Sequence, residues 1–176
     1  MPFLNPEQVI KSAGILPGMQ VADFGSGAGF YSIPLAKAVG SSGKVYALDA
    51  QKEMLELVRS KARASRLLNV STMVADLERP RGSNLAENTM DFVIISNILF
   101  QADDKPALLN EASRVLKNGG RTVVVEWSAY NLGAGPKTEM VVPKESAEKL
   151  LVSAGFRRVQ EFNAGENHYG LLYEKP

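Results

Sequence analysis

The sequence predicts an α/β fold: a doubly wound, mostly parallel sheet of seven strands, of which the last two form an antiparallel hairpin. Strand-like apolar runs alternate with segments of helical periodicity along the 176 residues. This alternation is typical of a parallel sheet with right-handed crossovers. The connection between the last two apolar runs is too short for a crossover, so these strands must pair antiparallel.

The elements follow one another in a regular order. The first helix has Asn5 in the capping position and Pro6 at its first residue, where proline is well tolerated. The run 90–95 is almost continuously apolar, as expected of a strand covered on both faces. We expect helices at 6–13, 31–39, 52–65, 105–116 and 144–154, strands at 20–24, 45–48, 70–75, 90–95, 121–126, 156–162 and 169–173, a glycine turn at 117–120 and a loop at 128–142.

Length and composition narrow the class of protein. Residues 1–176 are expected to form a single domain, with an N-terminal segment 1–19, a core 20–127 and a C-terminal part 128–176. A formal net charge of +1 gives no strong nucleic-acid signal. The absence of cysteine excludes disulfides and thiolate metal sites. With no membrane-length apolar run and no secretory signal, we predict a cytoplasmic protein without a metal site.

The most informative motif lies where the first strand meets the following helix. Asp23 precedes three alternating glycines, and Asp49 ends the next strand. A glycine-rich turn alone can be a ligand-free strand-to-helix connection, but its pairing with this acid favours a nucleoside ligand. The dinucleotide fingerprint is not met, because Phe30 stands where its last glycine belongs, and no phosphate-binding Gly-Lys-Ser/Thr occurs. Asp23 would repel phosphate and attract a cationic ligand.

At these residues the chain resembles the class I S-adenosylmethionine-dependent methyltransferases, which share a Rossmann-like fold. It is most similar to the small-molecule branch that includes quinone-biosynthesis C-methyltransferases and arsenite methyltransferases. The resemblance implies S-adenosylmethionine as cofactor and S-adenosylhomocysteine as product. Carried over motif by motif, the cofactor-binding residues are Asp23, Gly25, Gly27, Gly29, Asp49, Ala50, Asp76, Leu77 and Asn97. In the family the second acid binds the ribose hydroxyls and the third lies beside the adenine amino group, which implies these roles for Asp49 and Asp76. Ala50 and Leu77 would then lie on the two faces of the adenine ring.

The acceptor side of the site is less defined. No residue is identified as catalytic, and the candidates are His168, Tyr31 and Asn97, with Glu126 as a further titratable group. We expect His168 to lie in an exposed hairpin loop. Aromatic residues that could form walls of the acceptor site are Phe100, Tyr31, Trp127 and Tyr130.

The predicted function is methyl transfer from S-adenosylmethionine to a small-molecule acceptor by in-line displacement. Segment 1–19 is shorter than the N-terminal lid of fuller family members, so a dimer partner could complete it, and both monomer and homodimer stay open. An RNA or protein methyltransferase is the first alternative, although the turn after the fourth strand, Ser96–Leu99, lacks the prolines of an Asn-Pro-Pro-Tyr-type motif. A non-catalytic S-adenosylmethionine-binding or partner-activating subunit is the second.

Overall fold

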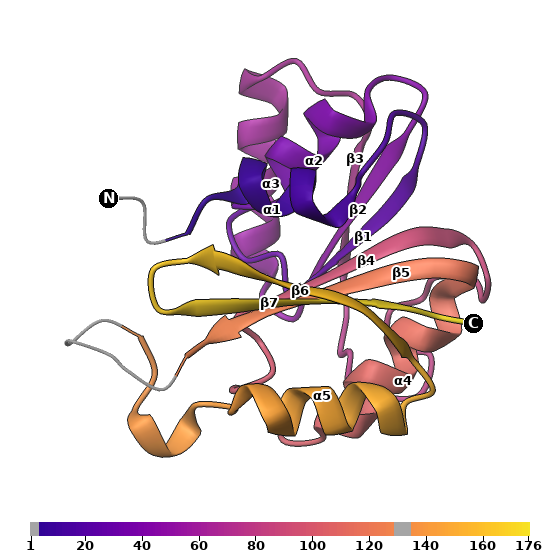
Figure 1. Cartoon of the computed structure of the whole chain (residues 1–176). Helices are drawn as coiled ribbons and strands as arrows, with labels where there is room; N and C mark the ends of the chain where they lie inside the picture. Colours follow the sequence, from indigo (N-terminus) through magenta and orange to yellow (C-terminus); the bar gives the residue numbers. More distant parts are fainter. Residues whose placement is uncertain (1–3, 129–134) are drawn as a thin grey trace.

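The computed structural model describes residues 4–128 and 135–176. One sheet of seven strands has the order β3-β2-β1-β4-β5-β7-β6 (Figure 1). The strands are β1 (Gln20–Phe24), β2 (Lys44–Asp49), β3 (Val70–Val74), β4 (Met90–Ser96), β5 (Leu116–Trp127), β6 (Arg157–Gly165) and β7 (His168–Glu174). The five strands β3, β2, β1, β4 and β5 are parallel to one another, and β7 pairs antiparallel with both β5 and β6. The predicted fold class is confirmed.

Helices cover both faces of this sheet. They are α1 (Pro6–Ala13), α2 (Ser32–Val39), α3 (Lys52–Ala64), α4 (Lys105–Val115) and α5 (Lys144–Ser153), with a 3₁₀ turn at Thr138–Met140. Figure 1 shows α1, α2 and α3 on one side and α4 and α5 on the other. Two buried apolar clusters fill the two interfaces, one including Val9 and Leu35, the other including Leu109 and Leu151. The sheet is therefore the middle of three layers.

The strand order reverses between β1 and β4, which are neighbours although two helices and two strands separate them in sequence. β1 leads to β2 on one side, whereas β4 leads to β5 on the other. The loops that follow β1 and β4 therefore diverge to opposite faces of the sheet. In open α/β sheets such a reversal leaves a crevice at the carboxyl ends of the strands, where ligands bind.

The N-terminal segment packs into the core. Asn5 caps α1 as predicted, since its side chain accepts the Gln8 N–H at 3.1 Å, and Gly14 ends the helix with φ of 73°. Val9 and Ala13 are buried in the cluster that also contains residues of α2. Helix α1 thereby contributes to the layer that α2 forms.

Two local predictions differ from the structure. The expected turn at 117–120 is a bulge within β5, because Met90 and Phe92 of β4 face Leu116 and Arg121. Gly119, with φ of 76°, permits this extra length. The expectation of an exposed His168 is wrong, since His168 is the first residue of β7 and only 6% exposed. The hairpin turn is tighter than its polar composition suggested.

Candidate functional site

A cavity of about 420 Å³ opens at the carboxyl ends of β1 to β4, where the strand order reverses. Its size falls within the range of small-molecule sites, roughly 300–1,000 Å³. The loops after all four strands and the neighbouring helices contribute to its walls. The lining residues are Gly25, Gly27, Asp49, Ala50, Gln51, Met54, Ala75, Asp76, Leu77, Glu78, Ser96, Asn97, Ile98, Gln101, Ala102 and Leu108.

The glycine loop forms one wall because its backbone approaches neighbouring elements closely. The N–H groups of Gly25 and Ser26 both donate to Leu48 O, at 2.8 and 2.9 Å, which ties the loop to the end of β2. Gly25 has φ of 73°, and a Cβ built on it would lie 2.3 Å from Ile98 Cγ2. Only glycine meets both conditions without strain.

Asp49 is fixed by the backbone on both sides of its carboxylate. Its Oδ2 accepts the Gly27 N–H at 2.8 Å, and its Oδ1 accepts the Gln51 N–H at 2.9 Å. Each carboxylate oxygen keeps a further lone pair for a hydroxyl donor. The side chain does not act as a helix cap, since Gln51 occupies that position without a side-chain bond.

Asp76 lines the cavity at the start of the loop after β3. Its Oδ1 accepts the Glu78 N–H at 3.2 Å, and its Oδ2 forms an ion pair with Arg79 Nε at 2.8 Å. Glu78 reaches across to the start of α4, where its Oε2 accepts the Asp104 N–H. These bonds hold the beginning of the loop against the cavity.

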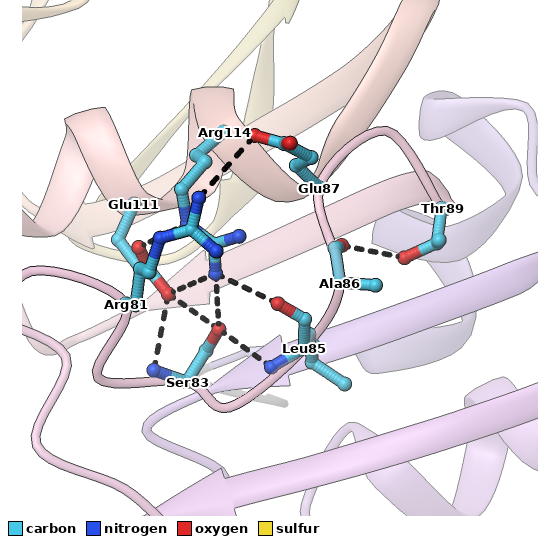
Figure 2. A network of polar contacts seen from close by, with 8 residues as sticks. All are labelled: Arg81, Ser83, Leu85, Ala86, Glu87, Thr89, Glu111 and Arg114. Carbon is cyan, nitrogen blue, oxygen red and sulfur yellow. Dashed lines mark hydrogen bonds and ion pairs between the residues drawn. The ribbon is translucent and has the colours of Figure 1, made fainter.

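A buried polar network holds the rest of this loop, as Figure 2 shows. Glu111 Oε1 accepts the N–H of Ser83 at 3.0 Å and a bond from Arg114 Nη2 at 2.7 Å. Arg114 Nη2 also donates to Leu85 O at 2.8 Å. Burial raises the pKa of Glu111, but the bonds from Arg114 and Ser83 outweigh it and leave this pKa below its ordinary value. The network therefore stabilises the ionised carboxylate and anchors the loop to α4.

Asn97 begins the turn after β4 in a left-handed conformation, with φ of 55°. Its N–H donates to Val125 O at 2.8 Å, and its carbonyl accepts from Gln101 Nε2 at 2.9 Å. The side-chain Oδ1 is buried and has no hydrogen-bond partner among the described residues. An unpaired acceptor in a cavity wall is suited to a ligand that donates a hydrogen bond. Left-handed backbone at a non-glycine residue is also common in functional sites.

The charge of the cavity fits a cationic nucleoside. Three carboxylates line it, those of Asp49, Asp76 and Glu78, and no lysine or arginine is among its described lining residues. A phosphorylated nucleotide would be repelled, whereas a positively charged sulfonium and an ammonium group would be attracted. With the unpaired Asn97 Oδ1, the residues present fit S-adenosylmethionine.

Seven of the nine predicted cofactor residues meet at this cavity, and Asp23 and Gly29 do not line it. Asp23 is only 2% exposed and points toward α2, where its Oδ2 accepts the Ser32 hydroxyl at 2.6 Å. Burial raises its pKa to about 7, and the charge of Asp49 adds to the shift. Gly29 lies against α3, with Val58 Cγ2 at 3.2 Å from the position of a Cβ. Both residues therefore join the glycine loop to the neighbouring helices α2 and α3.

Of the three residues considered for a catalytic role, His168, Tyr31 and Asn97, the cavity lining includes Asn97 alone. Tyr31 is buried, and its hydroxyl has no hydrogen bond of ordinary geometry in the described part of the chain. Burial raises its pKa, with Ser96 and Asp23 as the polar groups acting on it. Phe100 is half-buried and packs against the apolar cluster that includes Leu109 of α4. Tyr130 lies outside the described residues.

His168 and Trp127 form a pair beyond the cavity. They face each other across β5 and β7, with ring centroids 4.1 Å apart. Nδ1 of His168 lies 3.0 Å from Glu166 O, which can only accept, so this nitrogen carries a proton. Burial lowers the pKa of His168 and favours the neutral imidazole.

Sequence reasoning missed several cavity residues, notably Met54 of α3 and Gln101 in the turn before α4. Met54 follows the acid of β2 by five residues and Gln101 follows Asn97 by four. The spacing of four to five residues after each strand-end residue was the available signal, since a helix or a helix-like turn brings such a residue back toward the strand end.

Comparison with known proteins agrees with this geometry. The sequence pattern of the family described as "Methyltransferase domain" matches residues 15–167. A demethylmenaquinone methyltransferase of Staphylococcus aureus (strain MRSA252) is 36% identical over 127 residues, which cover 72% of this chain and 50% of that protein. The chain spans about half the length of several of the curated relatives it matches.

Solved structures support the same class. A structure of an S-adenosylmethionine-dependent methyltransferase from Aquifex aeolicus has a TM-score of 0.90 at 30% identity and covers 99% of this chain and 91% of that one. An arsenic(III) S-adenosylmethionine methyltransferase of Chlamydomonas reinhardtii shares the fold, with a TM-score of 0.71 at 21% identity, over 92% of this chain and 64% of that one.

Fold and site thus define an enzyme class, the S-adenosylmethionine-dependent methyltransferases with a Rossmann-like sheet. The chain belongs to the methyltransferase domain family, as the match over residues 15–167 establishes. The family, the class and the cofactor predicted from the sequence are confirmed. Across residues 4–128 and 135–176, no three potential metal ligands cluster. No helix in these ranges is both long and apolar enough to cross a membrane.

Proposed function

We propose that this chain binds S-adenosylmethionine in the cavity and transfers its methyl group to a small apolar or aromatic acceptor. The observation that carries the proposal is the cavity's charge: three carboxylates and no lysine or arginine among its described lining residues. The similarity to a demethylmenaquinone methyltransferase supports an acceptor of the aromatic, quinone-like class.

The ribose, the adenine and the ammonium group of S-adenosylmethionine each have a matching group in the cavity. Asp49 offers free lone pairs for the ribose hydroxyls, and Asp76 offers its carboxylate to the adenine amino group. Leu77 and Ala50 supply apolar contact for the adenine ring, and the unpaired Asn97 Oδ1 accepts from the ammonium group. Asp23 and Gly29 support the glycine loop without direct contact. These roles are assigned by chemistry and position within the cavity.

When bound, S-adenosylmethionine supplies a methyl group on a positively charged sulfur. The chain's own residues have to align the acceptor with that methyl group and exclude water, because orientation provides most of the acceleration in such a displacement. A general base is required only for an acceptor that is not already nucleophilic. Tyr31, Asn97 and His168 stay predictions for acceptor contact.

Incubation with methyl-labelled S-adenosylmethionine and a panel of metabolites, including naphthohydroquinones, tests the proposal. We expect label in a small aromatic product, and loss of label with Asp49→Asn. Label in RNA or protein alone would favour an RNA or protein methyltransferase. Calorimetric binding of S-adenosylmethionine without label in any acceptor would favour the non-catalytic subunit.

We also propose that the protein works in the cytoplasm, as a monomer or homodimer. The lack of cysteine supports a reducing compartment. None of the described residues in segment 1–19 lines the cavity, and a second copy that covered the cavity would act as its lid. Analytical ultracentrifugation with and without S-adenosylmethionine distinguishes the two assemblies.

A further inference from the structure

Glu126 is a fully buried carboxylate near the end of β5, and its side chain lies outside the cavity. Its Oε1 accepts the backbone N–H of Leu99 at 2.7 Å. Its Oε2 is buried without a hydrogen-bond partner among the described residues. Leu99 belongs to the turn that follows β4, and the backbone N–H groups of Ile98 in the same turn and of Trp127 also act on this carboxylate and lower its pKa.

That turn needs support from outside. Asn97 holds a left-handed backbone conformation, which asparagine adopts more readily than other non-glycine residues but still at a cost that neighbouring contacts offset. Two contacts with β5 do so: the Asn97 N–H donates to Val125 O at 2.8 Å, and Leu99 donates to Glu126. Ile98 lies between these two anchors.

Burying a carboxylate at position 126 carries a cost in desolvation free energy. Among the described residues no lysine or arginine forms an ion pair with Glu126; Lys105 of α4 acts on it only weakly and donates instead to Ala102 O. Tyr169 of β7 is the neighbouring titratable group, and its hydroxyl donates to Val142 O. Burial raises the pKa of Glu126 to about 7. An apolar side chain would avoid this desolvation.

The turn transmits its position to the cavity through Ile98. This side chain lies against the glycine loop, where a Cβ on Gly25 would be 2.3 Å from Ile98 Cγ2. Ser96, Asn97 and Ile98 all line the cavity. A shift of the turn would therefore change the width of the cavity between the loops after β1 and β4.

We infer that Glu126 is a positioning residue: by holding the Leu99 N–H it fixes the Ser96–Ile98 wall at the width that S-adenosylmethionine requires. This inference rests on the proposed function for the identity of the ligand. The acceptor oxygen is the required feature, and the negative charge is not.

Three substitutions separate these features. Glu126→Gln keeps an acceptor oxygen at the same reach and removes the charge. Glu126→Asp keeps the charge but is one methylene too short to reach Leu99, and Glu126→Leu removes the acceptor. Thr122→Val is the matched control, because Thr122 is buried on the same face of β5 with an unpaired hydroxyl and lies away from the cavity.

The experiment measures the Kd of S-adenosylmethionine by calorimetry and the exchange rate of the Leu99 amide hydrogen by NMR. For Glu126→Asp and Glu126→Leu we expect Kd to rise about 10-fold or more and Leu99 exchange to accelerate by a similar factor. Glu126→Gln should stay within about threefold on both readouts, and Thr122→Val should match the unaltered protein. If Glu126→Leu does not fold, Glu126→Asp carries the test.

The two possible failures are distinguishable. If the unaltered protein does not bind S-adenosylmethionine, the proposed function fails, and Leu99 exchange still reports whether Glu126 holds the turn. Unchanged Kd and unchanged Leu99 exchange in folded Glu126→Asp would overturn the inference alone. Equal losses in Glu126→Gln and Glu126→Leu would also overturn it, because charge rather than the acceptor oxygen would then matter.

Discussion

Asp49 Oδ2 accepts the backbone N–H of Gly27 at 2.8 Å, which joins the acidic end of β2 to the glycine loop after β1. The carboxylate thus orders the loop and faces the cavity at the same time. Its two functions draw on different lone pairs of the same oxygens. Asparagine keeps only one oxygen, so its NH2 group would face one of the two backbone N–H donors, and the substitution should weaken both the loop and ligand binding.

We expect Asp49→Asn to weaken S-adenosylmethionine binding about 10- to 100-fold, because a hydrogen bond to a charged group contributes about 1.5–3 kcal/mol. Calorimetry measures the change in Kd. Asp91→Asn is the control: Asp91 also accepts a backbone N–H, that of Gln20 at 2.8 Å, but lies near the start of β4, away from the cavity. Equal losses in the two variants would contradict a ligand role for Asp49.

Two glycines of the same loop should respond differently to alanine. Both have positive φ, 73° at Gly25 and 48° at Gly27, so each substitution carries a backbone cost of about 1 kcal/mol. At Gly25 the new methyl group would also meet Ile98, whereas nothing lies within 4 Å at Gly27. Overpacking adds typically about 1–3 kcal/mol.

Urea denaturation should therefore show a larger loss of unfolding free energy for Gly25→Ala than for Gly27→Ala. Adding Ile98→Ala to Gly25→Ala should recover part of that loss, because it removes the atoms that clash. Equal losses in the two single variants, or no recovery in the double variant, would show that Ile98 does not set the requirement for glycine.

Hydrophobic periodicity was sufficient to predict the elements and their directions. Nearly continuous apolar runs indicated strands covered on both faces, apolar residues every three to four positions indicated helices, and the short final connection allowed only a hairpin. The error at His168 arose from composition: Gly165, Glu166 and Asn167 are typical of an exposed loop. A bulge in β6 between Asn163 and Gly165 instead brings His168 into the sheet, opposite Trp127.

The site was predictable as far as strand ends could locate it. Asp49 is the last residue of β2, Asp76 and Asn97 follow β3 and β4, and parallel strands bring their carboxyl ends together. Asp23 differs because it lies one residue before the end of β1, where alternation turns its side chain toward α2 rather than toward the cavity. The role of Glu126 had no signal in sequence, since its partner is a backbone N–H 27 residues away.

The network of Figure 2 predicts how acid affects the loop after β3. The pKa of Glu111 is held below its ordinary value of 4.5, so its ionised form stabilises the folded state above that pH. This contribution is lost as pH falls through the lowered pKa. Glu111→Gln should lose about 2 kcal/mol at pH 7, because Arg114 loses its charged partner.

Urea denaturation at pH 7 and at pH 3 measures the effect. We expect the difference between Glu111→Gln and the unaltered protein to shrink at pH 3, because below the ordinary pKa of 4.5 the unfolded chain binds the proton more tightly than the folded protein does. Arg79→Gln is a suitable comparison, because its ion pair with Asp76 is exposed and should contribute little at either pH. A pH-independent deficit in Glu111→Gln would indicate that packing, rather than charge, holds the loop.

Asp23 should produce the opposite dependence on pH. Burial raises its pKa from 3.8 to about 7, so between these values the folded protein keeps a proton that the unfolded chain has released. Stability therefore falls as pH rises from about 4 to 7, by on the order of 1.4 kcal/mol for each pKa unit of the shift. Asp23→Asn cannot ionise and keeps an oxygen that accepts the Ser32 hydroxyl, so this penalty disappears.

The unfolding free energy of Asp23→Asn, relative to the unaltered protein, should increase between pH 4.5 and pH 8. Glu126, whose pKa is also raised by burial to about 7, contributes a similar slope to both proteins and cancels in the comparison. Asp91→Asn supplies the control, since Asp91 is partly exposed and paired with Lys117. If Asp23→Asn and the unaltered protein keep a constant difference across this range, Asp23 is ionised in the folded state at pH 4.5, and its bond from Ser32 outweighs its burial.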